Sequence, residues 1–360
     1  MKSIDLLVLL LSRLLLLAPL IRGFVARGDA RGKVVIEAGT AGWDLIEYEE
    51  LWQSGVEYLG PSRFVRFVKS SSLPYHRQLR SVLDKSISHF IFDSRSHSEN
   101  IRGDFTCLYL AFSLLSAGIV PVVRLTDYGS WRHRRRSLLL SCWTGLVLAL
   151  EHPHALKVSF SHGRIFGPMP MALSAATASA QSRKADDYLD KEGGIGFVGS
   201  LYPPRTALLE ELSLELQKSS ILGLEVISRN PNEPRGVNVD YWDALGRREF
   251  GLATTDHTED KQLVDLPPTR HAVFRLLEIP ITGAVLCAQE VYGFQKILRP
   301  GRDYLSFDNP AGLAETLQEL QSKPTLREEL ALSGRHRVRQ LAELNVFWTV
   351  TDYLLGRNGF

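Results

Sequence analysis

The feature of this sequence that most constrains its fold is a repeated alternation of short β-rich apolar runs with helical stretches. The first series of apolar runs lies at 33–38, 63–68, 89–93, 119–125, 144–150 and 157–160. Helices are expected between them, near 43–54, 74–85, 103–117 and 131–142. Such alternation is typical of parallel α/β units, in which each helix crosses from one strand to the next. It predicts a doubly wound domain over residues 33–170.

The alternation restarts in the second half of the chain and predicts another domain of the same kind over 195–345. Its expected strands are 195–200, 222–228, 248–255 and 283–288, and its expected helices are 204–218, 270–279, 310–321 and 325–342. Residues 171–194 are small and polar, which favours a connection between domains, and 346–360 hold a terminal helix. Two Rossmann-like halves predict a ligand crevice at the carboxyl ends of both sheets.

Composition excludes several classes of protein. The 360 residues are 44% hydrophobic and 23% charged, which excludes wholesale disorder. A net charge of +2, from 42 basic and 40 acidic residues, gives no general attraction for nucleic acid. Cys107, Cys142 and Cys287 are far apart and form no CxxC pair, so neither a disulfide framework nor a zinc site is expected, and a reducing compartment is the simplest interpretation.

Residues 1–32 begin with an apolar stretch, 4–21, which Asp5, Arg13 and Pro19 interrupt. Its eighteen residues are the lower limit for a membrane span, and a central arginine opposes insertion. Three alternatives are therefore open: a helix in the membrane interface, a helix packed on protein, and a span. The basic residues that follow favour a cytoplasmic chain with peripheral contact on the inner membrane face. The basic run 132–136 is either a solvated helix face or a site for anionic lipid headgroups or a lipid-diphosphate acceptor.

Two segments of the second domain could carry chemistry. GFVGSLYPPR, 196–205, reads as a strand, a turn at Gly199 and a helix start, so that the helix N-terminus and Arg205 could bind phosphate. FRLLEIPITGAVL, 274–286, places Glu278 at a helix end, where it is either a solvent-exposed carboxylate or an acceptor for a ribose diol. A further helix is predicted to begin at Pro310 with Asp308 or Asn309 as its cap.

These segments, taken in order over 195–345, resemble the C-terminal half of GT-B-fold glycosyltransferases, especially the spore-maturation-type branch with its glycosyl-transferase-like domain. GSLYPPR, 199–205, is similar to the family pattern G-R-L-x-x-x-K, with Ser200 in place of the arginine and Arg205 in place of the lysine. EIPITG, 278–283, is similar to E-A-x-A-x-G. The first glutamate of the family's E-x7-E element would fall at Arg270. LRE, 326–328, through Gly334 resembles the family's last helix.

The resemblance implies a fold of two Rossmann-like domains and a nucleotide-sugar donor bound by the second. It implies that Arg205 contacts the diphosphate and Glu278 the ribose, with Gly199 and Ser200 at the phosphate loop. Backbone amides near Thr282 and Gly283 would also face phosphate. Arg270 could touch the leaving diphosphate, which leaves retention or inversion undecided. No cofactor is implied beyond the donor substrate, and no metal either, since the chain contains no D-x-D triplet.

The first domain is expected to supply the acceptor site and a general base. Asp127, after the run 119–125, and Asp93, which closes the run 89–93, are the catalytic candidates, with Glu37 beside the 39–42 turn as another. Each of these carboxylates could equally be a helix cap.

We therefore expect a metal-independent, hexosyltransferase-type enzyme that serves a polysaccharide, lipid-linked or small acceptor in cell-envelope polysaccharide biosynthesis. A non-catalytic GT-B-like module that binds a nucleotide sugar or a partner enzyme at the membrane is the alternative. A sugar-nucleotide epimerase on the same fold is a third.

Overall fold

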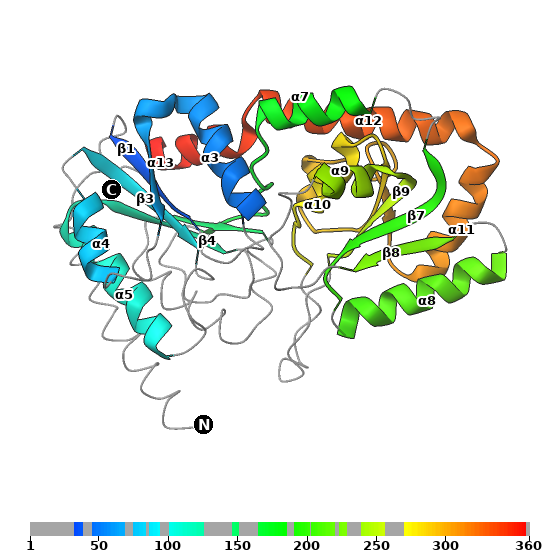
Figure 1. Ribbon diagram of the computed structural model, residues 1–360, viewed down its shortest axis with the longest axis horizontal. Helices are drawn as coiled ribbons and strands as arrows, with labels where there is room; N and C mark the ends of the chain where they lie inside the picture. The colour runs from blue at the N-terminus through cyan, green and yellow to red at the C-terminus, as the bar shows by residue number, and fades with distance from the viewer. Residues whose placement is uncertain are drawn as a thin grey trace. The chain divides into compact units, whose positions relative to one another are not determined.

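The computed structural model describes residues 32–38, 45–68, 75–83, 86–93, 101–125, 146–150, 165–185, 191–201, 203–219, 223–228, 239–255 and 270–357. The chain divides into two compact units. Unit 1 comprises Met1–Thr40, Leu59–Gly167 and Val350–Phe360, and unit 2 comprises Ala41–Tyr58 and Pro168–Thr349. Each unit is built around one parallel sheet, sheet A in unit 1 and sheet B in unit 2 (Figure 1).

Sheet A has the strand order β2-β1-β3-β4-β5-β6, and all its neighbours pair in parallel. Its strands are β1 (Lys33–Ala38), β2 (Phe64–Val68), β3 (Ile87–Asp93), β4 (Val120–Leu125), β5 (Leu146–Ala149) and β6 (Ile165–Phe166). Helices α4 (Tyr75–Val82) and α5 (Ile101–Ser116) follow β2 and β3, and a short 3-10 helix (Pro61–Arg63) precedes β2. Five predicted strands are confirmed. The strand expected at 157–160 and the helix expected at 131–142 lie outside the described residues, and β6 was not predicted.

The core of unit 1 lies between sheet A and the pair α4 and α5. All seven residues of β3 are buried, as expected for a central parallel strand covered on both faces. Phe90 and Phe92 of β3 pack in one cluster with Leu79 of α4 and Leu110 of α5. The continuous apolar runs that predicted these strands are therefore the runs that fill the core.

Burial of His89 in β3 predicts a pH-dependent stability for unit 1. Desolvation, with Arg63 nearby, lowers the pKa of His89 to about 4, against about 6.5 in the unfolded chain. Between these values the unfolded chain binds a proton that the folded chain does not, so stability falls as pH drops from 6.5 to 4. We expect His89→Gln to remove up to about 3 kcal/mol of this loss. Urea unfolding of both proteins at pH 8, 6 and 4.5 measures it, and equal pH profiles would contradict it.

Sheet B has the strand order β11-β10-β9-β7-β8 and is also parallel throughout. Its strands are β7 (Glu192–Gly199), β8 (Leu224–Ser228), β9 (Arg248–Ala253), β10 (Val285–Gln289) and β11 (Leu305–Phe307). The helices are α8 (Pro203–Ser219), α9 (Val239–Gly246), α10 (Arg275–Ile281), α11 (Pro310–Gln321) and α12 (Pro324–Glu343), with a 3-10 helix at Phe294–Lys296. The predicted terminal helix is α13 (Val346–Arg357). The strand β11 and the helix α9 were not predicted.

Residues 171–194, which we expected to be a connection, contain a helix, α7 (Ala175–Lys184). Ser174 caps it by accepting a hydrogen bond from the Thr177 amide at 3.1 Å. Helix α3 (Leu45–Leu59) supplies further acceptors. Its Glu50 accepts from the Ser174 amide at 2.7 Å, and its Glu57 accepts from the Ala175 amide at 2.7 Å. These contacts hold most of α3 in unit 2, although α3 follows β1 in sequence.

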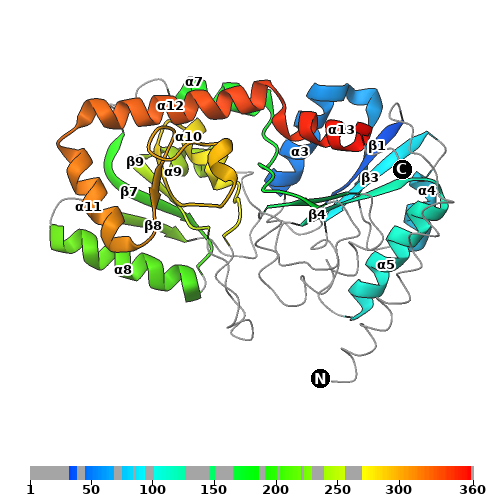
Figure 2. The same cartoon turned by 180° about the vertical axis from the view of Figure 1, so that it is seen from behind.

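Helices α11 and α12 complete unit 2, with α11 beside α8. Asn309 caps α11 by accepting from the Gly312 amide at 2.9 Å, as predicted, and Pro310 opens the helix. Helix α12 packs beside α7 and α10 (Figure 2). Gly334 of α12 approaches the backbone closely, because a Cβ there would lie 2.4 Å from the Asp303 carbonyl oxygen. Across the described residues, no helix combines the length and apolarity that a bilayer crossing requires.

Candidate functional site

The carboxyl ends of β7, β9 and β10 lie next to one another at one edge of sheet B. We call this the carboxyl edge. Parallel strands bring together the residues at and just after their ends, and here these include Ser200, Thr254, Thr255 and Gln289. The amide of Thr255 donates to the Gln289 side-chain oxygen at 3.1 Å, and the Thr255 hydroxyl donates to the Gln289 carbonyl at 3.2 Å. This is the edge at which open parallel sheets bind ligands.

Arg205, the predicted phosphate ligand, lies at the carboxyl edge in the first turn of α8. Its Nε donates to the Thr254 hydroxyl at 2.7 Å, and its Nη1 donates to the Ser200 carbonyl at 2.6 Å. The guanidinium carbon lies 5.3 Å from the centre of the Phe197 ring. The structure thus brings together Gly199, Ser200 and Arg205, three of the predicted donor residues, and it holds the guanidinium firmly in place.

Arg275, which the sequence analysis did not single out, shares the Phe197 ring with Arg205. It opens α10, is only 5% exposed, and its guanidinium carbon lies 5.6 Å from the ring centre. Its Nη2 lies against the backbone of Gly199, because a Cβ on Gly199 would be 2.4 Å from it. The absence of a side chain at Gly199 therefore makes room for this guanidinium.

In the part of the chain that the structure describes, no hydrogen bond reaches the buried Nε of Arg275 and no carboxylate forms an ion pair with Arg275. A buried guanidinium normally has such partners, because burying an unpaired charge costs several kcal/mol. The aromatic ring compensates in part. This arrangement is suited to an anion that reaches the carboxyl edge beside Gly199.

Glu278 lies one helical turn after Arg275 and is 1% exposed. The hydroxyl of Tyr241, near the start of α9, donates to Glu278 Oε2 at 2.9 Å. The ring of Tyr241 in turn contacts the ring of Trp242 edge-on at 5.9 Å. Glu278 is therefore a buried, oriented carboxylate rather than a solvent-exposed helix end. Its spacing of three residues from Arg275 is the signal that could have identified the arginine.

Arg270, by contrast, has a carboxylate partner. Its Nη1 lies 3.4 Å from Asp308 Oδ1 and 3.5 Å from the Glu290 carbonyl oxygen. Asp308 is exposed, so the ion pair contributes little to stability. Arg270, which we expected near the leaving diphosphate, therefore forms an ion pair beside β10 and β11. The buried arginine beside Gly199 is Arg275.

Thr282 and Gly283 lie at the opposite edge of sheet B, where the strands begin. Their amides donate to the carbonyls of Ile279 and Pro280 at the end of α10. The Thr282 carbonyl accepts from Lys191 Nζ at 2.9 Å, at the start of β7. We therefore correct the expectation that these two amides face phosphate: helix α10 crosses the sheet, and only its first turn reaches the carboxyl edge.

The matches in α12 have structural roles. Arg327 forms an ion pair with Glu249 at 3.3 Å, and Gly334 permits the close packing described above.

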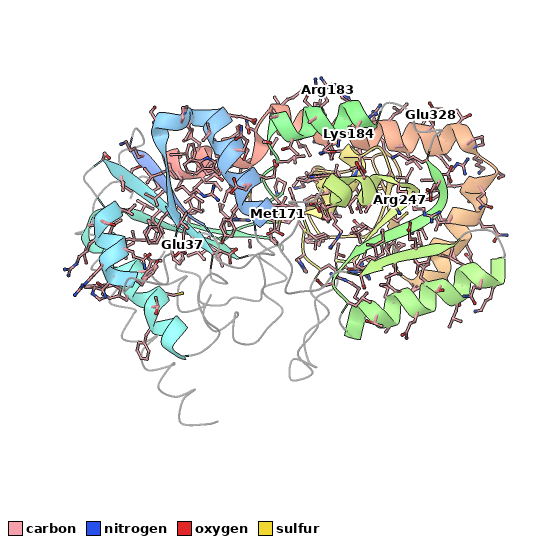
Figure 3. All side chains as sticks on the ribbon, in the orientation of Figure 1. Glu37, Met171, Arg183, Lys184, Arg247 and Glu328 are labelled. Atoms are coloured by element: carbon pink, nitrogen blue, oxygen red, sulfur yellow. The ribbon has the colours of Figure 1, made fainter. Side chains whose placement is uncertain are left out.

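Two acceptor-side candidates lie at the carboxyl ends of strands in unit 1. Asp93 ends β3, is buried, and stands in register with Arg124 of β4. Glu37, which is labelled in Figure 3, is buried near the end of β1. It accepts a hydrogen bond from the Tyr75 hydroxyl at 2.9 Å. Burial and the neighbouring Glu37 raise the pKa of Tyr75 well above 10. Asp127 and the basic run 132–136 lie outside the described residues.

Comparison with known proteins bears on the fold and on the C-terminal region. Residues 229–345, which include Arg275 and Glu278, match the glycosyl transferase-like family model. HepE of Anabaena, in complex with UDP and glucose, is 11% identical with a TM-score of 0.54 over 90% of this chain and 99% of its own. The fold is GT-B. The predictions of two parallel-sheet domains and of a glycosyl transferase-like C-terminal region are confirmed.

Two further GT-B structures support the same assignment of fold. Sucrose-phosphate synthase from Thermosynechococcus elongatus is 12% identical, with a TM-score of 0.59 over 90% of this chain and 98% of its own. A glycosyltransferase from Rickettsia africae is 10% identical, with a TM-score of 0.51 over 91% of this chain and 98% of its own. No curated protein sequence matches the chain.

The sequence analysis expected no metal site. Within the described ranges, no group of three histidine, cysteine, aspartate or glutamate side chains is placed to hold a metal ion.

Proposed function

We propose that this GT-B protein is a glycosyltransferase that transfers a hexosyl group from a nucleoside-diphosphate donor to a polysaccharide, lipid-linked or small acceptor. The observation that carries the proposal is Arg275, whose guanidinium is buried at the carboxyl edge of sheet B with no carboxylate partner and no hydrogen bond to its Nε among the described residues. A donor diphosphate beside Gly199 would supply the missing partners. The family match and the UDP complex of HepE support this class of ligand.

In the proposed reaction, the bond between the anomeric carbon and the diphosphate oxygen breaks, and the acceptor hydroxyl oxygen forms the new bond to that carbon. Negative charge grows on the departing diphosphate. Arg275 stabilises it in a water-poor position, and Arg205, fixed by Thr254 and Ser200, adds further positive charge. Because guanidinium groups supply this charge, we propose that the transfer needs no divalent metal and no cofactor.

The remaining parts of the proposal concern the acceptor. The proton of the acceptor hydroxyl passes to a carboxylate of unit 1, for which Asp93 and Asp127 are our candidates. The basic residues that follow the apolar stretch 4–21 favour a cytoplasmic chain, so that the donor comes from the cytoplasmic pool. A role in cell-envelope polysaccharide synthesis fits this arrangement.

A thermal-shift screen tests the donor site directly. The purified chain is heated with UDP, GDP, ADP, CDP, the corresponding nucleotide sugars, and the matching monophosphates as controls. We expect one diphosphate to stabilise the protein, by about 2.7 kcal/mol at a hundredfold excess over its dissociation constant. The monophosphate of the same base should stabilise it much less, since it lacks the second phosphate.

The outcome separates the alternatives. Binding with sugar transfer to an acceptor supports the glycosyltransferase, binding without any turnover supports the non-catalytic module, and donor turnover without acceptor supports an epimerase. A folded protein that binds no member of the panel overturns the donor site.

A further inference from the structure

The outward face of helix α5 in unit 1 is aromatic. Phe105, Tyr109 and Phe112 are spaced by four and three residues, so they lie on one face of the helix. They are 58%, 43% and 52% exposed. The opposite face, with Cys107, Leu110 and Leu114, is fully buried against sheet A. A surface helix ordinarily carries polar and charged residues on its outward face, and α5 carries aromatic rings there instead.

Helix α4, on the same side of sheet A as α5, carries a group of exposed basic residues. Both helices cover the same side of sheet A, since Leu79 of α4 packs in the same core cluster as Leu110 of α5 (Figure 1). The outward side chains of α4 include His76, Arg77 and Arg80, all exposed, and its sequence YHRQLRSV has no acidic residue. We call the exposed side chains of both helices the α4–α5 face: His76, Arg77, Arg80, Phe105, Tyr109 and Phe112.

We propose that the α4–α5 face binds the surface of a lipid bilayer that contains anionic headgroups. Aromatic rings partition into the boundary between headgroups and acyl chains, and arginines beside them pair with lipid phosphates. The combination of exposed aromatics with an all-basic neighbour matches both the apolar and the charged layer of such a surface. Interfacial binding of this kind requires no membrane-crossing helix, and it does not depend on the proposed donor site.

Flotation of the full chain with vesicles tests this proposal. Vesicles of phosphatidylcholine alone are compared with vesicles that contain about 30% phosphatidylglycerol, which gives them a strongly anionic surface. The double variant Phe105→Ser, Tyr109→Ser is compared with Tyr292→Ser, which removes an exposed aromatic ring from unit 2. The double variant Arg77→Glu, Arg80→Glu is compared with Arg302→Glu, which changes an exposed arginine of unit 2.

We expect the full chain to prefer the anionic vesicles. The aromatic variant should bind about tenfold more weakly to both vesicle types. The arginine variant should lose at least about fivefold for each arginine on anionic vesicles at low salt, and little on neutral ones. The unit 2 variants should bind as the wild type does.

Several outcomes would overturn the proposal. One is vesicle binding that none of the α4–α5 variants changes, which would assign membrane contact to another part of the chain, such as 4–21. Another is a soluble chain with no affinity for either vesicle. A third is self-association that the aromatic variant abolishes while vesicle binding persists, which would make the face a protein contact. Circular dichroism of each variant shows whether it is folded, and nucleotide-induced stabilisation in the same variants should stay unchanged.

Discussion

Replacing Arg275 with methionine is expected to raise the stability of the free protein and, at the same time, to remove its stabilisation by a nucleoside diphosphate. The two effects have opposite signs because one charge is responsible for both. In the free protein the guanidinium is buried beside the Phe197 ring, and no carboxylate of the described residues pairs with it. Methionine fills a similar volume without a charge, so we expect a gain of about 1–4 kcal/mol in unfolding free energy.

The diphosphate complex should respond in the other direction. Arg275 would lose its charge-assisted hydrogen bonds to the ligand, each of which contributes about 1.5–3 kcal/mol. Two such bonds correspond to a loss of at least about a hundredfold in affinity. The same loss should appear in kcat/KM for transfer, and mainly in kcat if the charge acts on the departing diphosphate.

The measurement is a melting curve of each protein with and without the diphosphate found in the screen. Arg270→Met is the matched control, since it removes an arginine of the same segment that pairs with the exposed Asp308, and it should change little. Gly199→Ala is an independent variant, because its Cβ would collide with the Arg275 guanidinium and displace it. An Arg275→Met protein that melts lower than the wild type and still responds fully to the diphosphate would refute the assignment.

The sheets could be predicted from the sequence because a buried parallel strand is marked by its own local run of apolar residues. Both β3 and β10 are fully buried along their length, and most of their residues are apolar. Helix α7 was missed because its stability is not local. Its residues are small and polar, and its first amides are satisfied by Glu50 and Glu57 of α3, far away in sequence.

The residues of the candidate site also differ in how far the local sequence predicts them. Gly199, Arg205 and Glu278 could be selected because each stands at a junction between strand, loop and helix in a recognisable order. Arg275 was not selected, because an arginine in a helix is ordinarily exposed and only its spacing of three residues from Glu278 pointed to it. The burial of Arg275 depends on Phe197 and Gly199, which belong to strand β7. Thr282 and Gly283 follow Glu278 closely in sequence, yet α10 carries them to the opposite edge of the sheet.

Replacing Glu278 with glutamine is expected to abolish discrimination between ribose and deoxyribose in the bound nucleotide. Glu278 is buried and fixed by the Tyr241 hydroxyl at 2.9 Å, one turn after Arg275 on α10. A carboxylate in that position can accept from ribose hydroxyls while the diphosphate contacts Arg275. Glutamine keeps the size, and its oxygen can still accept from Tyr241, so the variant should fold. It lacks the charge, and donor affinity should fall by about tenfold or more for each hydroxyl bond weakened.

A thermodynamic cycle that combines a protein substitution with removal of a ligand hydroxyl isolates this contact from general damage. UDP, 2′-deoxy-UDP and 3′-deoxy-UDP are titrated into the wild type, Glu278→Gln and Tyr241→Phe, provided that UDP is the diphosphate which binds in the screen. In the wild type, removal of a contacted hydroxyl should weaken binding, whereas the Glu278→Gln protein should bind UDP and the deoxy analogue equally. Tyr241→Phe removes only the orienting bond, so it should lower stability by about 1 kcal/mol and keep part of the preference for ribose. If Glu278→Gln still distinguished the ribose hydroxyls as the wild type does, the carboxylate would be a structural partner of Tyr241. The ribose would then have to be bound by another residue of the carboxyl edge.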